Sequence, residues 1–212
     1  MSAHAATADL TVPHATTISR AADGPASVQI VVAYGFWIFL LSDIIMFSAF
    51  FATYAVLSGE TAGGPSGRDL FNLRNVGIET LCLLFSSYTC GLGILAVARR
   101  RMGAFYLSFA LTFVLGATFL RFEIAEFAGM IASGAGPSRS AFLSAFFSLV
   151  GLHGAHVTAG LLWLTFMVAQ TAVKGPRDFV LRRLLCFSLF WHALDIIWVA
   201  IFTIVYLIGT LP

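Results

Sequence analysis

The sequence predicts an all-α integral membrane protein built as a bundle of five transmembrane helices. Of its 212 residues, 59% are hydrophobic and 10% are charged, and the mean hydropathy is +0.91. Soluble domains carry about 25% charged residues. Five apolar stretches are long enough to cross a hydrocarbon core of roughly 30 Å, which needs about 20 helical residues. Lipid offers backbone groups no hydrogen-bond partner, so each stretch must be a helix.

The predicted spans form a single domain, 30–212, and short polar connections separate them. The fourth span is longer than crossing requires, so it must tilt, bend or project from the bilayer. Residues 1–29 are polar, contain His4 and His14, and are expected to form a disordered tail. The spans are expected at 30–57, 76–98, 104–132, 141–173 and 184–209, with connections at 59–75, 99–103, 133–140 and 174–183.

The basic residues predict an orientation. The N-terminal tail and the connections 99–103 and 174–183 carry one, three and four Lys or Arg residues, against three in the two opposite connections. By the positive-inside rule, the N-terminus is then cytoplasmic and the C-terminus periplasmic. The net charge of +2 comes mostly from these arginines and does not indicate nucleic-acid binding.

The three cysteines, Cys82, Cys90 and Cys186, all fall within spans and lack the paired spacing of a zinc, haem-attachment or dithiol motif. They are expected to be buried thiols. Polar residues inside the spans are therefore the candidates for function.

Asp43 lies about 13 residues into the first span, roughly 20 Å along the helix axis and near the middle of the bilayer. A carboxyl at this depth is a functional candidate by default. It is either a protonated group hydrogen-bonded by Ser42 or a neighbouring helix, or a proton-exchanging group at a subunit interface or a lipid-filled cleft.

Four further charged residues lie toward the predicted outer surface. Glu79 opens the second span, where it is expected to reach water. Glu123 and Glu126 of the third span are three residues apart and share a helix face, whereas Arg121 is offset from both. Arg121 is therefore expected to pair with Glu79 or with a lipid phosphate.

Glu123 and Glu126 admit several interpretations: a general acid–base pair, part of a di-metal site, or structural or proton-relay groups. Di-iron bundles use Glu-x-x-His motifs on two helices, and this sequence contains none. The structural or proton-relay interpretation is favoured.

A histidine and carboxylate constellation is predicted from the last two spans. His153 and His156 share one face of the fourth span, and His192 and Asp195 lie one turn apart on the fifth. Together they could hold a metal. Packing histidines are favoured, because small residues around the first pair allow close helix contact with polar groups as interhelical partners: Gly151, Gly154, Ala155, Ala159 and Gly160.

These polar positions, in order along all five spans, resemble subunit III of the haem–copper terminal oxidases. The matching segments are FWIFLLSD at 36–43, FATY at 51–54, ExxEF at 123–127, FLSAFF at 142–147, HGxHV at 153–157 and WHxxDxxW at 191–198. Cytochrome c oxidase members commonly have seven helices and a glutamate at the position of Asp43. Five spans, Asp43 and the loop 61–69 are similar to the cytochrome o ubiquinol oxidase branch, whereas Arg121 departs from the family pattern.

The resemblance implies a subunit of a ubiquinol:oxygen oxidoreductase in a bacterial inner membrane. Such a respiratory-chain complex oxidises ubiquinol, reduces oxygen to water and moves protons outward. Subunit I holds the haems and copper. This chain is then expected to carry no redox cofactor, no metal and no catalytic residue, to support subunit I and its access to lipid, oxygen or protons, and to bind phospholipid.

On this interpretation Asp43 faces subunit I or lipid, while Glu123, Glu126, His153, His156, His192 and Asp195 form a structural polar network. Three alternatives stay open: subunit III of a cytochrome c oxidase, a free-standing membrane metalloenzyme, and a proton-coupled carrier. The carrier is weakened because no span has the Gly/Pro interruptions of broken transport helices.

Overall fold

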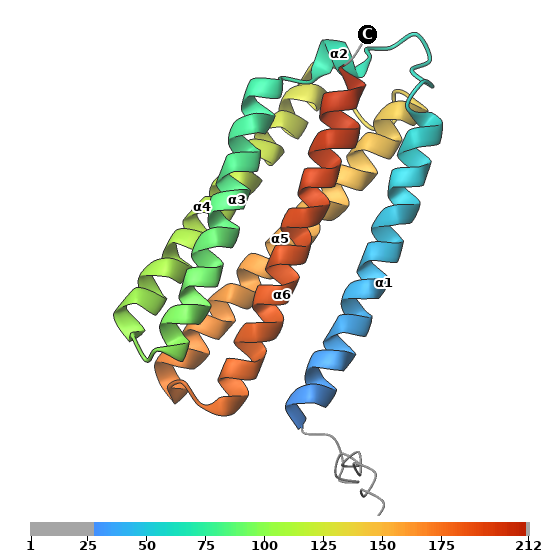
Figure 1. Ribbon diagram of the computed structural model, residues 1–212. Coiled ribbons are helices and arrows are strands. Elements are labelled where there is room, and N and C mark those ends of the chain that lie inside the picture. Colours follow the sequence, from blue (N-terminus) through green and yellow to red (C-terminus); the bar gives the residue numbers. More distant parts are fainter. Residues whose placement is uncertain (1–27, 211–212) are drawn as a thin grey trace, which may run out of the picture.

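The computed structural model describes residues 28–210 and confirms an all-helical fold. Five long helices lie side by side (Figure 1), and a single turn, α2 (Gly67–Leu70), follows the first of them. None of the described residues is in a strand. All but the last two residues of the predicted tail lie outside the described part. The long helices are α1 (Val28–Leu57), α3 (Leu73–Ala98), α4 (Met102–Ala132), α5 (Ala141–Lys174) and α6 (Asp178–Ile201).

Local sequence signals set several helix ends. The Asn72 side chain accepts a hydrogen bond from the Arg74 backbone N–H at the start of α3, and Ser140 caps α5 by accepting from the Leu143 N–H. Helix α5 stops at Gly175, whose φ of 72° is accessible to glycine at little cost.

The last helix starts earlier than predicted. The expected connection 174–183 is wrong, because α6 already begins at Asp178. Pro176 cannot continue α5, and the acidic Asp178 favours a helix start at the positive end of the helix dipole. Arg182 and Arg183 therefore extend from the first turns of α6.

The end of α6 widens into a π-helix, η1 (Phe202–Leu207). In a π-helix each backbone N–H bonds the carbonyl five residues earlier, one residue further than in an α-helix. Such segments often occur at functional sites. Tyr206, in η1, is buried.

The helices divide into a tight group and a peripheral one. Helices α3 and α4 form a hairpin, α5 and α6 lie in the centre, and α1 packs against α5 and α6 on the far side (Figure 1). Half of the most apolar window of α5 is buried within the chain, 50%, against 11% for α1. The outer faces remain apolar, as a membrane or partner surface requires.

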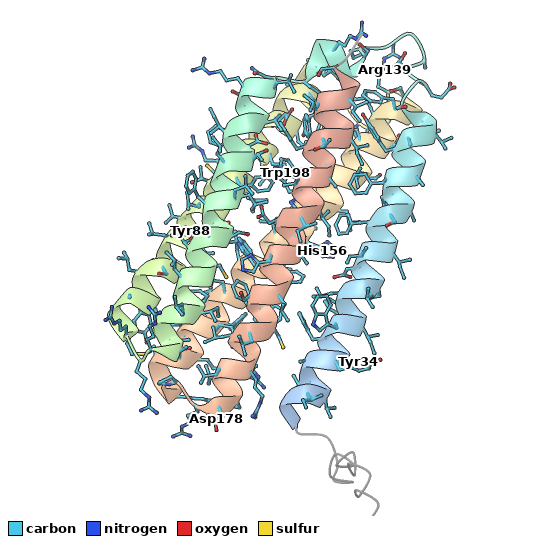
Figure 2. All side chains as sticks on the ribbon, in the orientation of Figure 1. Tyr34, Tyr88, Arg139, His156, Asp178 and Trp198 are labelled. Carbon is cyan, nitrogen blue, oxygen red and sulfur yellow. The ribbon has the colours of Figure 1, made fainter. Side chains whose placement is uncertain are left out.

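The connections between the helices gather at the two ends of the bundle. The α3–α4 and α5–α6 turns lie together with the start of α1 at one end, whereas α2 and the end of η1 lie at the other (Figure 1). Figure 2 places Asp178 at the first end and Arg139 at the second, while Tyr34 and Tyr88 project outward between them.

Candidate functional site

Two tryptophans attach α6 to α3. Trp191 donates its indole N–H to Ser86 Oγ, and Trp198 donates to Thr80 Oγ1, both at 3.0 Å. Trp191 and Trp198 are seven residues apart and so share a helix face. All four residues are buried, so each hydrogen bond satisfies a polar group that has no access to water.

Two glycines make room for Trp191. A Cβ atom at Gly160 of α5 would lie 2.8 Å from the indole ring, and one at Gly116 of α4 would lie 3.0 Å from it. The ring thus fills a slot between α4 and α5 that only residues without a side chain can line. Of the small residues predicted to allow close packing, Gly160 does so here, with the tryptophan inserted between the helices.

His153 lies at the centre of an aromatic cluster. Its ring stacks on Trp198 with centroids 5.2 Å apart and meets Phe119 edge-on at 5.7 Å. Neither ring nitrogen has a hydrogen-bond partner among the described residues. The predicted packing role fits this contact, but ring stacking and not hydrogen bonding provides it.

His156 forms a bond within its own helix. Its Nδ1 lies 2.8 Å from the carbonyl oxygen of Leu152. A carbonyl can only accept, so Nδ1 carries the hydrogen. The ring lies 5.2 Å from that of Phe47 on α1. Figure 2 shows His156 and Trp198 in the interior of the bundle.

His192 and Asp195 lie on α6, both half-buried. Asp195 interacts electrostatically with His192, yet its Oδ1 atom is buried without a partner in the described part of the chain. His192 also lines an apolar cleft of about 590 Å³ between α1 and α6. Within residues 28–210, no three His, Cys, Asp or Glu side chains converge as metal ligands would.

Asp43 is half-buried on α1. The structure gives it no side-chain hydrogen bond from Ser42, whose hydroxyl donates instead to the carbonyl oxygen of Phe39 at 2.7 Å. The residue does not line the cleft between α1 and α6.

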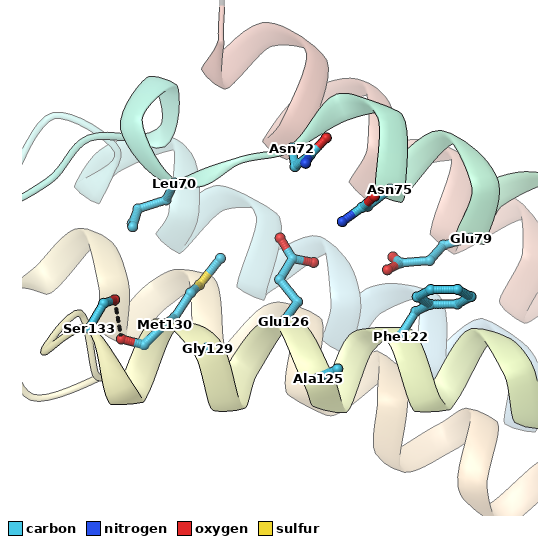
Figure 3. Close-up of a pocket in the computed structure, with 10 residues that line it drawn as sticks. All are labelled: Leu70, Asn72, Asn75, Glu79, Phe122, Ala125, Glu126, Gly129, Met130 and Ser133. Carbon is cyan, nitrogen blue, oxygen red and sulfur yellow. Dashed lines mark hydrogen bonds between the residues drawn. The ribbon is translucent and has the colours of Figure 1, made fainter.

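Three glutamates gather between α3 and α4. Glu79, Glu123 and Glu126 interact electrostatically with one another, and the hydroxyl of Tyr206 in η1 lies 3.4 Å from Glu126 Oε2. Glu79 and Glu126 line a pocket of about 370 Å³. Figure 3 shows their carboxyl groups turned toward one another across the gap between the two helices.

The predicted surroundings of Glu79 are wrong. Its side chain is buried, only 1% exposed, and lines a pocket between α3 and α4 instead of lying at the exposed end of the helix. Arg121 lies on the exposed face of α4, and within the described residues no ion pair joins it to Glu79. Three residues of α3 precede the predicted start of the span, so Glu79 lies deeper than predicted. Its side chain lies on the face of α3 that meets α4.

Some interior partners were not predicted. Thr80, Ser86 and Tyr206 provide interhelical hydrogen bonds, and Thr89 of α3 also bonds Thr112 of α4 at 2.8 Å. A usable signal exists for the first two, because a buried tryptophan N–H needs an acceptor. Thr80 and Ser86 are six residues apart on α3, which runs antiparallel to α6. This spacing is within one residue of the seven that separate Trp191 and Trp198.

Comparison with known proteins identifies the family. Residues 15–210 match the family described as cytochrome c oxidase subunit III. The chain belongs to this subunit III family. The predicted resemblance is thereby confirmed, as is a membrane-spanning subunit of the haem–copper oxidases.

Several relatives of this subunit III chain have names from the quinol-oxidising branch. A protein of Pseudomonas aeruginosa named cytochrome bo(3) ubiquinol oxidase subunit 3 is 52% identical over 84% of this chain and 85% of its own length. A Buchnera aphidicola protein of the same name is 42% identical over 82% and 90%. Quinol oxidase subunit 3 of Bacillus subtilis is 43% identical over 82% and 86%.

Proposed function

We propose that this chain is the non-redox subunit III of a proton-translocating ubiquinol oxidase of the cytochrome o type in a bacterial inner membrane. The observation that carries the proposal is the 52% identity to a relative named as such a subunit. Ubiquinol is oxidised by the complex and not by this chain. The haems and copper belong to subunit I.

The interior contacts support a structural contribution. The indole N–H groups of Trp191 and Trp198 attach α6 to α3 by hydrogen bonds. His153 contributes a stacked ring to the core. Buried tryptophans with satisfied N–H groups stabilise a helix interface. The chain then serves subunit I by presenting it with a rigid apolar surface.

The cleft between α1 and α6 supports a lipid contribution. It is lined mainly by apolar side chains, with His192 and Ser48 as polar exceptions. In a membrane, the acyl chain of a lipid is the molecule whose apolar surface matches this lining. Asp43, half-buried on the same α1 helix, is the candidate for proton exchange or contact with subunit I.

A tag on this chain tests the proposal. Purification in mild detergent should recover a partner with a haem spectrum, and the complex should consume oxygen with ubiquinol and not with reduced cytochrome c. Removal of this chain should leave the haem spectrum and the initial rate near normal while inactivation accelerates. Recovery of the chain without a haem-bearing partner, or with metal bound to itself, would refute the proposal.

A further inference from the structure

The carboxyl group of Glu79 lies at the wall of a pocket without a hydrogen-bond partner for one of its oxygens. The pocket lies between the start of α3 and the end of α4, close to α2 (Figure 3). Glu79 is 1% exposed and Glu123 2% exposed, and the Oε2 atom of each is buried without a partner among the described residues. Glu126, which faces Glu79, is bonded by Tyr206. Three acidic groups therefore share one poorly solvated region.

In the described part of the chain, no positive side chain balances these groups. Within residues 28–210, none of the three glutamates forms an ion pair with Lys or Arg. The titratable groups that face them are Tyr206 from η1 and Cys82 from α3, which interacts with Glu79. From α5, Gly154 lies against Glu123, so that a Cβ there would be 2.6 Å from Oε1. Carboxylates in mutual repulsion away from water need a bound proton or a bound cation.

The side-chain directions favour the proton. A metal cation needs several oxygen ligands around one point, but Glu123 is turned toward Gly154 of α5 while Glu79 and Glu126 face the pocket. No three acidic side chains in the described part converge with such geometry. A proton needs only one carboxylate oxygen and can be shared between neighbouring carboxyls.

We propose that Glu79, Glu123 and Glu126 form a proton-holding site, which exchanges protons with water through the pocket beside α2. A proton passes from water to a carboxylate oxygen and returns, without electron transfer. The π-turn of η1 positions the Tyr206 hydroxyl on Glu126 and so couples this site to the end of α6. The proposal concerns the carboxyls of this chain and does not depend on the electron donor of the complex.

Carbodiimide labelling of the intact complex in membranes tests the site. The reagent consumes the protonated acid, whose O–H adds across the N=C=N group. With a positively charged, membrane-impermeant carbodiimide at pH 7, Glu79 or Glu126 should be labelled about tenfold faster than an exposed carboxyl at the same end of the bundle. Glu60, exposed in the connection after α1, provides that internal control.

A second measurement does not depend on reagent access. The wild-type complex should show an infrared C=O band of protonated carboxyl that shifts in heavy water, and Glu79→Gln or Glu126→Gln should reduce it. Tyr206→Phe should move the pH at which the band disappears. Tyr54→Phe is the matched control, because that buried tyrosine bonds the backbone carbonyl of Val205 and not a carboxyl.

Two outcomes would overturn the proposal. One is labelling of Glu79 and Glu126 no faster than that of Glu60, together with a band that both glutamine variants leave unchanged. The other is loss of labelling when calcium or sodium chloride is added at constant ionic strength, because the site would then hold a cation. Haem content of the same preparation reports separately on the oxidase assignment.

Discussion

The indole nitrogen of Trp191 on α6 lies 3.0 Å from the hydroxyl oxygen of Ser86 on α3, 105 positions away in the sequence. Seven residues further along α6, Trp198 repeats the contact with Thr80. The two bonds fix both the rotation and the height of α6 relative to α3.

Removal of either acceptor should destabilise the chain. Ser86→Ala or Thr80→Val leaves a buried indole N–H without a partner, which costs about 1–2 kcal/mol. Thermal inactivation of the solubilised complex should accelerate accordingly. Thr118→Val is the control, because the Thr118 hydroxyl bonds only the Val114 carbonyl of its own helix. Equal stability of all three variants would mean that these interhelical bonds contribute nothing.

Gly160→Ala should be damaging in a different way. The new methyl group would lie 2.8 Å from the Trp191 ring, so α5 and α6 must separate or the ring must move. Overpacking of this kind costs about 1–3 kcal/mol. Gly77→Ala on α3, where a Cβ meets nothing within 4 Å, should be neutral in the same thermal assay. A well-assembled, fully stable Gly160→Ala protein would contradict the slot described for Trp191.

His192→Ala and Asp195→Ala separate structure from chemistry. If these residues support helix packing, each variant should loosen the subunit from its complex and shorten its lifetime, while the haem spectrum and initial oxygen consumption stay near wild type. The loss expected for one unsatisfied neutral partner is about 1–3 kcal/mol. Durable, fully assembled variants without turnover would instead assign the pair to catalysis.

Fusion reporters test the predicted orientation. The connections rich in Lys and Arg should face the cytoplasm, so a reporter within Arg99–Arg101 should behave as cytoplasmic. A reporter after Pro212 should behave as periplasmic, which would also place the pocket at Glu79 on the outer side. The reverse pattern would refute the orientation and move the opening of that pocket to the cytoplasm.

The sequence predicts the helices better than the contacts between them. Span length and hydropathy depend on the local chain alone, so five helices could be predicted with ends within a few residues, apart from the early start of α6. That start depends on the turn at Gly175 and Pro176. The basic residues after this turn belong to α6, but in the sequence they resemble a longer polar connection.

The partners of polar residues depend on helix rotation, which hydropathy does not determine when all faces are apolar. His153 and Asp195 could be placed inside the bundle, but the stacking of His153 on Trp198 could not be predicted. Depth counted from the first apolar residue places Glu79 near water, whereas α3 begins at Leu73 and so places it deeper.

The packing of α1 has a consequence for biosynthesis. Helices α3 and α4 are neighbours in sequence and contact one another extensively, whereas α1 packs on α5 and α6. During synthesis on the ribosome, the α3–α4 hairpin can close as soon as both helices leave the translocon. Phe47 of α1 must wait for His153 and His156 of α5 to arrive. Helix α1 is inserted before α5 and α6 and is thus among the last to reach its native neighbours. Until then it is an open surface for an insertion chaperone or for the wrong partner.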